Sequence, residues 1–196
     1  KINRHGRYAF SAIHERADYD WPDGKRLAVY LGMNLEVFSF GEGLGAELAP
    51  GGPQPDVLNF AWRDYGNRVG APRLLELFDR LEVPCTALVN SQIYTEAPGL
   101  AEAFAARGDE IAGHGRTNAE RQGILSENEE RMLIEQSTAV LSAQHGRKPK
   151  GWLGPWISQS HVTPDLLQEA GYEYLLDWCH DDQPTWMTSR SDRILS

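Results

Sequence analysis

The 196-residue sequence has few cysteines and no long apolar run. Its two cysteines, Cys85 and Cys179, are too few and too far apart for a disulfide framework or a Cys-x-x-Cys metal site. Each lies in an apolar, strand-like run, which favours a buried, reduced thiol. Because no stretch reaches about 18 consecutive apolar residues, a membrane-spanning helix is not expected.

The sequence also has fewer basic than acidic residues. The 19 Lys and Arg residues face 28 Asp and Glu residues, which gives a formal charge of −9. Nucleic acids and anionic membranes bind basic surfaces, so neither is expected as a partner. A small, neutral or weakly charged substrate fits better. No charged-then-apolar leader opens the chain, so the cytoplasm is the expected compartment, and Lys1 at the first position leaves a processed N-terminus open.

What the sequence does contain is an alternation of apolar runs and helical patterns. The expected strands cover residues 27–38, 85–90, 109–115, 150–155 and 172–178, and the expected helices cover 70–83, 96–108, 126–144 and 163–171. Residues 41–55, rich in glycine and proline, are expected to form an irregular loop. Short connections between strand and helix predict an α/β domain over residues 1–196 with parallel strands, either an open doubly wound sheet or a barrel.

In both architectures the active groups lie at the carboxyl ends of the strands. Glu36 falls at such an end, inside an apolar run where an ionised carboxylate is costly. The pKa of Glu36 should therefore rise toward the range of a general base, which makes it the candidate for water activation. The structural alternative is a Glu36 side chain that turns outward and pairs with Arg68.

An imidazole and a second carboxylate are expected at the same edge. His114 stands between two glycines at a strand exit, where backbone and substrate can approach closely, although a lone histidine is often a hydrogen-bonded core residue. Asp177, at the end of the last expected strand, is placed to orient His114 or to bind a substrate N–H. The three predicted catalytic residues are therefore Glu36, His114 and Asp177.

Several polar and aromatic residues near these strand ends are candidates for substrate binding. Asp181 and Asp182 precede Pro184, so they either cap a turn or contribute to a site. Trp156 and Trp186 either wall a pocket or pack in the core.

The order of these segments resembles the polysaccharide deacetylase (NodB-homology) family, and more closely its branch of metal-independent allantoinases and cyclic-imide hydrolases. The stretches that carry the resemblance are "WPDGKRLAVYLGMNLE", "DYGNRVGAPRLLELFDRLEVPCTALVN", "GDEIAGHGRTN", "GRKPKGWLGP" and "LLDWCHDDQPTW". The resemblance implies a distorted (β/α) barrel of about seven strands that hydrolyses an amide-type C–N bond.

The resemblance also bears on the metal. Metal-dependent members carry an Asp ligand and a His-x-x-x-His pair, whereas the matching positions here are Val37, His114 and Asn118. Such a set is a poor zinc site, so no tightly held metal is expected. The branch keeps the Asn and Glu of the first strand, here Asn34 and Glu36. It also shares the Asp-Asp-x-Pro-x-Trp stretch, which implies that Asp181, Asp182 and Trp186 bind substrate. Asn34, Asn118 and Trp156 complete the set of expected substrate-binding residues.

The leading hypothesis is a hydrolase of a small cyclic imide, amide or ureide that works without bound cofactor. The branch carries a Thr-Gly-Arg triplet where this chain has "GWLGPWIS", so allantoin itself is not assigned. One alternative is an N-acetyl-sugar deacetylase with a loosely held divalent metal such as zinc, and another is a binding protein on the same fold. Members of the family usually continue for about another hundred residues, so we expect either a fragment or a barrel that lacks its C-terminal strands. An open edge of this kind favours a homo-oligomer.

Overall fold

A seven-stranded sheet organises the computed structural model, which describes residues 2–196. The strands are β1 (Gly32–Leu35), β2 (Thr86–Val89), β3 (Glu110–Gly113), β4 (Gly151–Trp152), β5 (Tyr174–Leu175), β6 (Trp186–Thr188) and β7 (Arg193–Leu195). Their order in the sheet is β1-β2-β3-β4-β5-β7-β6, and every neighbouring pair is parallel except β6 and β7. The predicted α/β fold with parallel strands is confirmed, and the sheet is open, with β1 and β6 at its edges.

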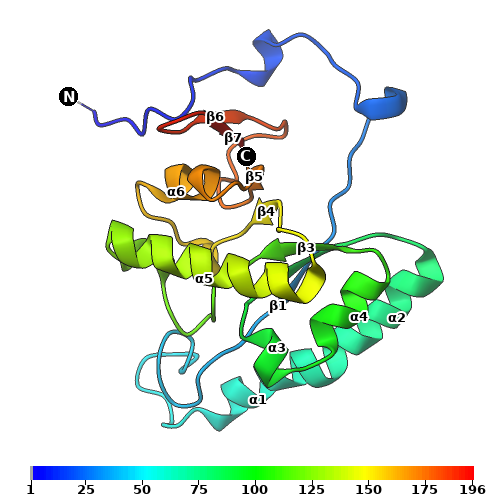
Figure 1. Cartoon of the computed structure of the whole chain (residues 1–196), viewed down its shortest axis with the longest axis vertical. Helices are drawn as coiled ribbons and strands as arrows, with labels where there is room; N and C mark the ends of the chain where they lie inside the picture. The colour runs from blue at the N-terminus through cyan, green and yellow to red at the C-terminus, as the bar shows by residue number, and fades with distance from the viewer. Residues whose placement is uncertain (1) are drawn as a thin grey trace.

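Six α-helices of the described part of the chain connect these strands. They are α1 (Val57–Tyr65), α2 (Ala71–Leu81), α3 (Ile93–Glu96), α4 (Leu100–Ala106), α5 (Glu127–His145) and α6 (Thr163–Glu169). Figure 1 shows α1 to α4 grouped at one end of the molecule and β6 and β7 at the other, with α5 lying across the region between them. Within residues 2–196, no helix has both the length and the apolar character that crossing a bilayer requires.

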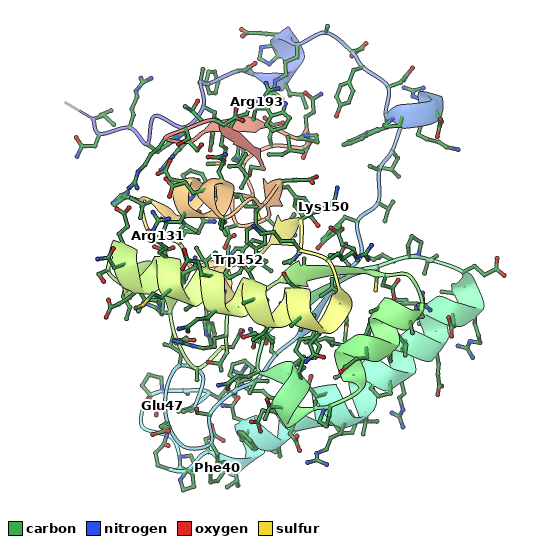
Figure 2. The ribbon with its side chains drawn as sticks, viewed as in Figure 1. Phe40, Glu47, Arg131, Lys150, Trp152 and Arg193 are labelled. Carbon is green, nitrogen blue, oxygen red and sulfur yellow. The ribbon has the colours of Figure 1, made fainter. Side chains whose placement is uncertain are left out.

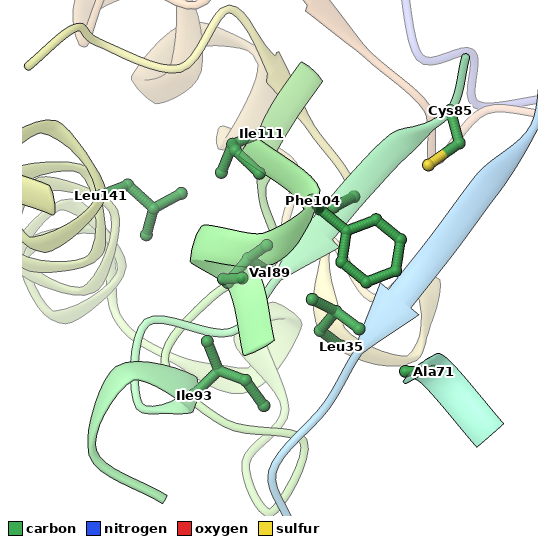
Figure 3. Packing of buried hydrophobic residues seen from close by; sticks show 10 residues of the cluster. Leu35, Ala71, Cys85, Val89, Ile93, Phe104, Ile111 and Leu141 are labelled. Carbon is green, nitrogen blue, oxygen red and sulfur yellow. The ribbon is translucent and has the colours of Figure 1, made fainter. Parts of the chain in front are cut away.

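The first hydrophobic core joins β1, β2 and β3 to helices α2, α3 and α4. Phe104, Leu35 and Val89 are each 0% exposed, and Figure 3 shows the Phe104 ring beside Leu35. Burial of each such side chain stabilises the fold by roughly 1.5–3 kcal/mol. This packing fixes the carboxyl ends of β1 to β3.

A second core lies between α5, α6 and the strands β4, β5, β6 and β7. Trp152 is its largest side chain and is fully buried (Figure 2). The Trp152 ring meets Tyr172 edge to face at 5.3 Å between centroids, and the Tyr172 hydroxyl is 2.7 Å from Thr138 Oγ1. The buried hydroxyl pair satisfies polar groups that would otherwise be costly inside this core.

The first strand is shorter than the sequence predicts. β1 begins at Gly32, and the preceding residues 27–31 are not strand; Leu27 and Val29 are 75% and 74% exposed. The expectation of a strand over 27–38 buried on both faces is therefore wrong: only Gly32–Leu35 form the strand, and within it only Leu35 is buried. The last backbone hydrogen bond between the two strands runs from Thr86 N–H to the Leu31 carbonyl. Pro84, two residues before Thr86, has no N–H that could pair with the residues before Leu31.

The N-terminal segment runs along the outside of the molecule before it reaches β1 (Figure 1). Two arginines attach it to the C-terminal half. Arg7 forms a two-pronged ion pair with Asp165 of α6, with both N–O distances 2.6 Å. Arg16 pairs with Asp181 in the same way, at 2.8 and 2.6 Å.

The two cysteines differ in environment, and both are free thiols. Cys85 is buried, and burial together with Asp109 raises the pKa of its thiol to about 12. Cys179 is exposed, so the expectation of a buried thiol is wrong for that residue. The connection that carries Cys179 follows β5 and lies on the surface rather than inside a strand.

Candidate active site

Polar residues stand at the carboxyl ends of the first three strands. Glu36 follows β1, Asn90 follows β2 and His114 follows β3 directly. Because these strands are parallel neighbours, their ends lie at one edge of the sheet. The tight core beneath them holds the three side chains at fixed relative positions.

Glu36 and His114 are in direct contact. His114 Nε2 lies 3.2 Å from Glu36 Oε1, and His114 Nδ1 lies 2.6 Å from the carbonyl oxygen of Leu153. A carbonyl oxygen only accepts, so Nδ1 carries a proton. A hydrogen bond between Nε2 and the carboxyl then needs one further proton, held by either group. Glu36 and His114 therefore form a proton-sharing pair.

The pKa of Glu36 is shifted in the opposite direction from the expectation. Burial raises it, but hydrogen bonds from His114 and Asn34 and the charges of His114 and Arg63 together outweigh burial. The Asn34 amide donates to Glu36 Oε1 at 3.1 Å. The net pKa of Glu36 lies below its ordinary value of 4.5, so the prediction of a raised pKa is wrong. The alternative pairing with Arg68 is also absent, because Arg68 binds Asp64.

The side chain of Asn90 forms hydrogen bonds with the segments that follow β1 and β3. Its side chain is 0% exposed. Its Oδ1 accepts the N–H of Val37 at 2.8 Å, while its Nδ2 donates to the His114 carbonyl and, at 3.1 Å, to Asn118 Oδ1. One buried amide thus holds segments that follow β1 and β3, which is how the fold sets the separation of Glu36 and His114.

The Glu36–His114 pair opens into a cavity of about 170 Å³. Trp156 forms part of its wall, and its indole N–H donates to the Asn118 carbonyl at 2.7 Å. Trp156 adopts φ of +62°, a left-handed backbone conformation that costs energy for a residue with a Cβ. The lining residues are Asn34, Glu36, Phe38, Arg63, His114, Asn118, Leu153, Trp156 and Ile157.

Asp177 is near this cavity but does not line it. Its Oδ1 accepts the Gly154 N–H at 2.9 Å, and its Oδ2 is buried with no hydrogen-bond partner in residues 2–196. Burial raises the pKa of Asp177 to about 6. The Leu153 carbonyl, rather than Asp177, is the hydrogen-bond partner of His114 Nδ1, so the expected orientation of the imidazole by Asp177 is corrected.

The structure does not bring the other three predicted binding residues to this cavity. Asp181 pairs with Arg16 and also accepts the Gln183 N–H, as a turn-capping Asp does. Asp182 lies beside it on a separate cavity. Trp186, in β6, is 50% exposed, and Arg193 lies over its ring at 4.1 Å.

Arg63, which the sequence analysis did not identify, does line the cavity. It belongs to α1, a helix that was not predicted because its apolar residues face outward: Leu58 and Trp62 are 58% and 61% exposed. Its polar residues face inward instead, with Asn59 only 4% exposed. The available signal was the N-cap residue Asp56 followed by Asn59 and Arg63 at the spacing of one helical face.

The donors at this edge do not fit a catalytic zinc ion. Zinc sites of this kind take three protein N, S or carboxylate ligands. Here Val37 offers none, and Asn118 Oδ1 is engaged by Asn90. Residues 2–196 contain no group of three or more His, Cys, Asp or Glu side chains arranged to hold a metal ion.

The fold and the cavity define an α/β domain that presents a carboxylate–imidazole pair at the carboxyl ends of parallel strands. Comparison of the sequence with known families identifies this domain more closely: the polysaccharide deacetylase family matches residues 57–175. The chain belongs to the polysaccharide deacetylase family, as the resemblance in the sequence implied.

Individual relatives agree with this assignment. A peptidoglycan deacetylase of Helicobacter pylori is 26% identical over 118 residues, covering 60% of this chain and 40% of that protein. A structure described as a probable polysaccharide deacetylase from Pseudomonas aeruginosa PAO1 matches with a TM-score of 0.77 at 26% identity, over 93% of this chain and 66% of the other. The PuuE allantoinase structure matches in fold with a TM-score of 0.74 at 23% identity, over 93% and 65%. The chain thus spans less than two thirds of the length of each.

Proposed function

We propose that this protein hydrolyses a non-peptide C–N bond in a small cyclic imide, amide or ureide, without a tightly bound metal. The observation that carries the proposal is the Glu36–His114 contact, which faces a cavity of about 170 Å³. Cavities for drug-sized ligands are about 300–1,000 Å³, so this one suits a single small ring. Membership of a family named for deacetylation supports hydrolysis of an amide-type bond.

In the proposed reaction, the Glu36 carboxylate takes a proton from a water molecule as that water attacks the ring carbonyl carbon. The C–N bond then breaks as His114 gives its Nε2 proton to the leaving nitrogen. The Leu153 carbonyl holds the Nδ1–H of His114, which keeps the ring oriented while Nε2 exchanges its proton. The products are a carboxylic acid and an amine or amide on one opened chain.

The test is turnover of succinimide, hydantoin and dihydrouracil by the wild type and by Glu36→Gln, with and without chelator. Loss of a general base lowers kcat by roughly 10²–10⁴-fold. Glu76→Gln, an exposed glutamate on α2, is the matched control and should keep wild-type turnover. Full ring-opening activity in Glu36→Gln would contradict the role of that residue.

A second candidate is deacetylation of an N-acetylated sugar. Its support is the likeness to the H. pylori peptidoglycan deacetylase and a neighbouring cavity of about 770 Å³, also lined by Glu36 and Arg63, that has room for sugar residues. Acetate release from chitin oligosaccharides, dependent on added zinc and abolished by chelator, would favour this candidate. Binding of rings or sugars without turnover of either would indicate a binding protein.

A further inference from the structure

Arg63 is a cation held rigidly at the wall of the cavity. Its guanidinium lies over the Phe38 ring, 3.7 Å from the ring centroid, and 5.8 Å from the Trp156 ring. Its Nε donates to Asn59 Oδ1 at 3.2 Å. Stacking on one side and a hydrogen bond at Nε leave the two terminal nitrogens as the free donors of the guanidinium.

The support beneath Arg63 is itself buried and hydrogen-bonded. Asn59 is 4% exposed, and its Nδ2 donates to the Gly45 carbonyl at 2.7 Å. Gly45 has φ of +71°, and a Cβ there would come within 3.1 Å of Arg63 Nη2 and 2.9 Å of Trp156. The loop therefore needs glycine at this position to fit against the arginine and the tryptophan.

Arg63 differs from the ion-paired arginines of this chain. Arg7, Arg16 and Arg107 each bind a carboxylate at 2.6–2.7 Å, whereas no carboxylate in residues 2–196 lies within 4 Å of the Arg63 guanidinium. Burial lowers the pKa of Arg63, and the only charge that opposes this effect is the more distant Glu36. A partly buried guanidinium without a close counter-ion is a ready site for an incoming anion.

We propose that Arg63 binds a carboxylate carried by the substrate, so that the preferred substrates are small rings with an acidic substituent. That the bound carboxylate belongs to a substrate rests on the proposed function. Binding of a carboxylate by Arg63 rests on the geometry of the site alone. The two terminal nitrogens can hold both oxygens of a carboxylate at once, which a single carbonyl oxygen cannot match. Because Arg63, Glu36 and His114 line the same cavity, the acidic group is attached close to the bond that breaks.

The binding test compares hydantoin-5-acetate with hydantoin-5-acetamide, which has nearly the same shape and no charge. Both are titrated calorimetrically into the Glu36→Gln protein, so that turnover does not interfere. The acetate should bind about 10- to 100-fold more tightly than the acetamide, as expected for a two-pronged charged hydrogen bond. Adding Arg63→Met should remove this preference, and adding Arg63→Lys should leave part of it.

Arg73→Met is the control, because Arg73 is exposed on α2 and donates to Tyr65 outside the cavity; it should retain the preference. Thermal unfolding of each variant checks that Arg63→Met still folds, and Arg63→Lys provides a milder change at the same site. Equal affinity for acetate and acetamide, no measurable binding of either, or a preference that survives in Arg63→Met would overturn the proposal.

The same probes separate this inference from the proposed function. If the acetate binds through Arg63 but no ring is opened by the wild-type protein, the proposed hydrolysis fails and the binding site stands. If rings are opened and the ratio of kcat/KM for acetate over acetamide is near one in both wild type and Arg63→Met, the hydrolysis stands and the carboxylate site is wrong.

Discussion

Asp177→Asn should make the protein more stable at neutral pH and remove part of the pH dependence of its stability. Asp177 has one buried oxygen without a partner and an ordinary pKa of 3.8 that burial raises to about 6. Asparagine keeps the Oδ1 acceptor for the Gly154 N–H but cannot ionise. The substitution therefore removes a buried charge and leaves the local hydrogen bond in place.

The magnitude follows from the two pKa values. Each pKa unit corresponds to about 1.36 kcal/mol, so a rise from 3.8 to about 6 is worth about 3 kcal/mol. Because the folded-state pKa is raised, the folded protein binds a proton that the unfolded chain has lost between these values. The contribution of Asp177 to stability is present in full below 3.8 and is lost as the pH rises through about 6.

Urea denaturation of wild type and Asp177→Asn from about pH 4 to about pH 8 measures this effect. The free energy of unfolding of the variant, relative to wild type, should increase by about 2 to 3 kcal/mol across that range. Asp20→Asn, at an exposed position, is the control and should show no such trend. A constant difference between variant and wild type at every pH would refute the claim that burial raises the pKa of Asp177.

Three further predictions concern the pair and its supports. In an Asp177→Asn background, the acid-side fall of kcat/KM for ring opening should come only below about pH 4.5, because Glu36 must be ionised to accept a proton and its pKa lies below that value; an acid-side midpoint well above it would be inconsistent. Asn90→Ala should cost about 2–4 kcal/mol in denaturant unfolding, since buried partners lose their hydrogen bonds, and a cost under about 0.5 kcal/mol would argue against its bridging role. Gly113→Ala should cost about 1–3 kcal/mol, because its Cβ would lie 2.5 Å from the buried Trp152 ring; an unchanged melting temperature would show that the tryptophan moves.

The sequence predicts the interior of the fold well because burial there shapes the pattern directly. Residues 86–89 form a strand that is buried at every position, and the expected apolar run at 85–90 reflects this. The long helix expected over 126–144 is α5, which begins with a capping box between Ser126 and Glu129. Elements can be predicted from the sequence alone where burial or a helix cap leaves a clear local pattern of residues.

Elements at the cavity and at the sheet edge are harder to predict from the sequence. α1 buries Asn59, turns Arg63 toward the cavity and leaves Leu58 and Trp62 in solvent, so its pattern is reversed relative to an ordinary amphipathic helix. Residues 27–31 are apolar enough for a strand, yet their pairing with β2 stops at the hydrogen bond from Thr86 N–H to the Leu31 carbonyl. In both places the conformation depends on what the segment meets in three dimensions.

The placement of active groups at strand ends predicted Asn34, Glu36, His114 and Trp156, which all line one cavity, as does Asn118, to which the family resemblance pointed. Strand position alone could not give the direction of a pKa shift. For Glu36 the expectation considered burial alone. The structure adds two hydrogen bonds and two positive charges, which together exceed the effect of burial. At Asp177 burial prevails, because hydrogen bonds from Gly154 and Gln159 and the charge of His114 lower the pKa by less than burial raises it. The sign of a shift depends on the balance of contacts, which the sequence does not display.

Two carboxylates near the active site differ in pKa and in contact with the cavity. Asp177 has a pKa near 6, which suits a general base, but it does not line the cavity. Glu36 lines the cavity but has a lowered pKa, and part of that lowering comes from the charge of His114. In the proposed reaction His114 gives its proton to the leaving nitrogen, and this cause then disappears. The pKa of Glu36 rises at that moment, so the carboxyl group holds the proton taken from water once the ring has opened, and passing it to the deprotonated His114 Nε2 restores the starting pair.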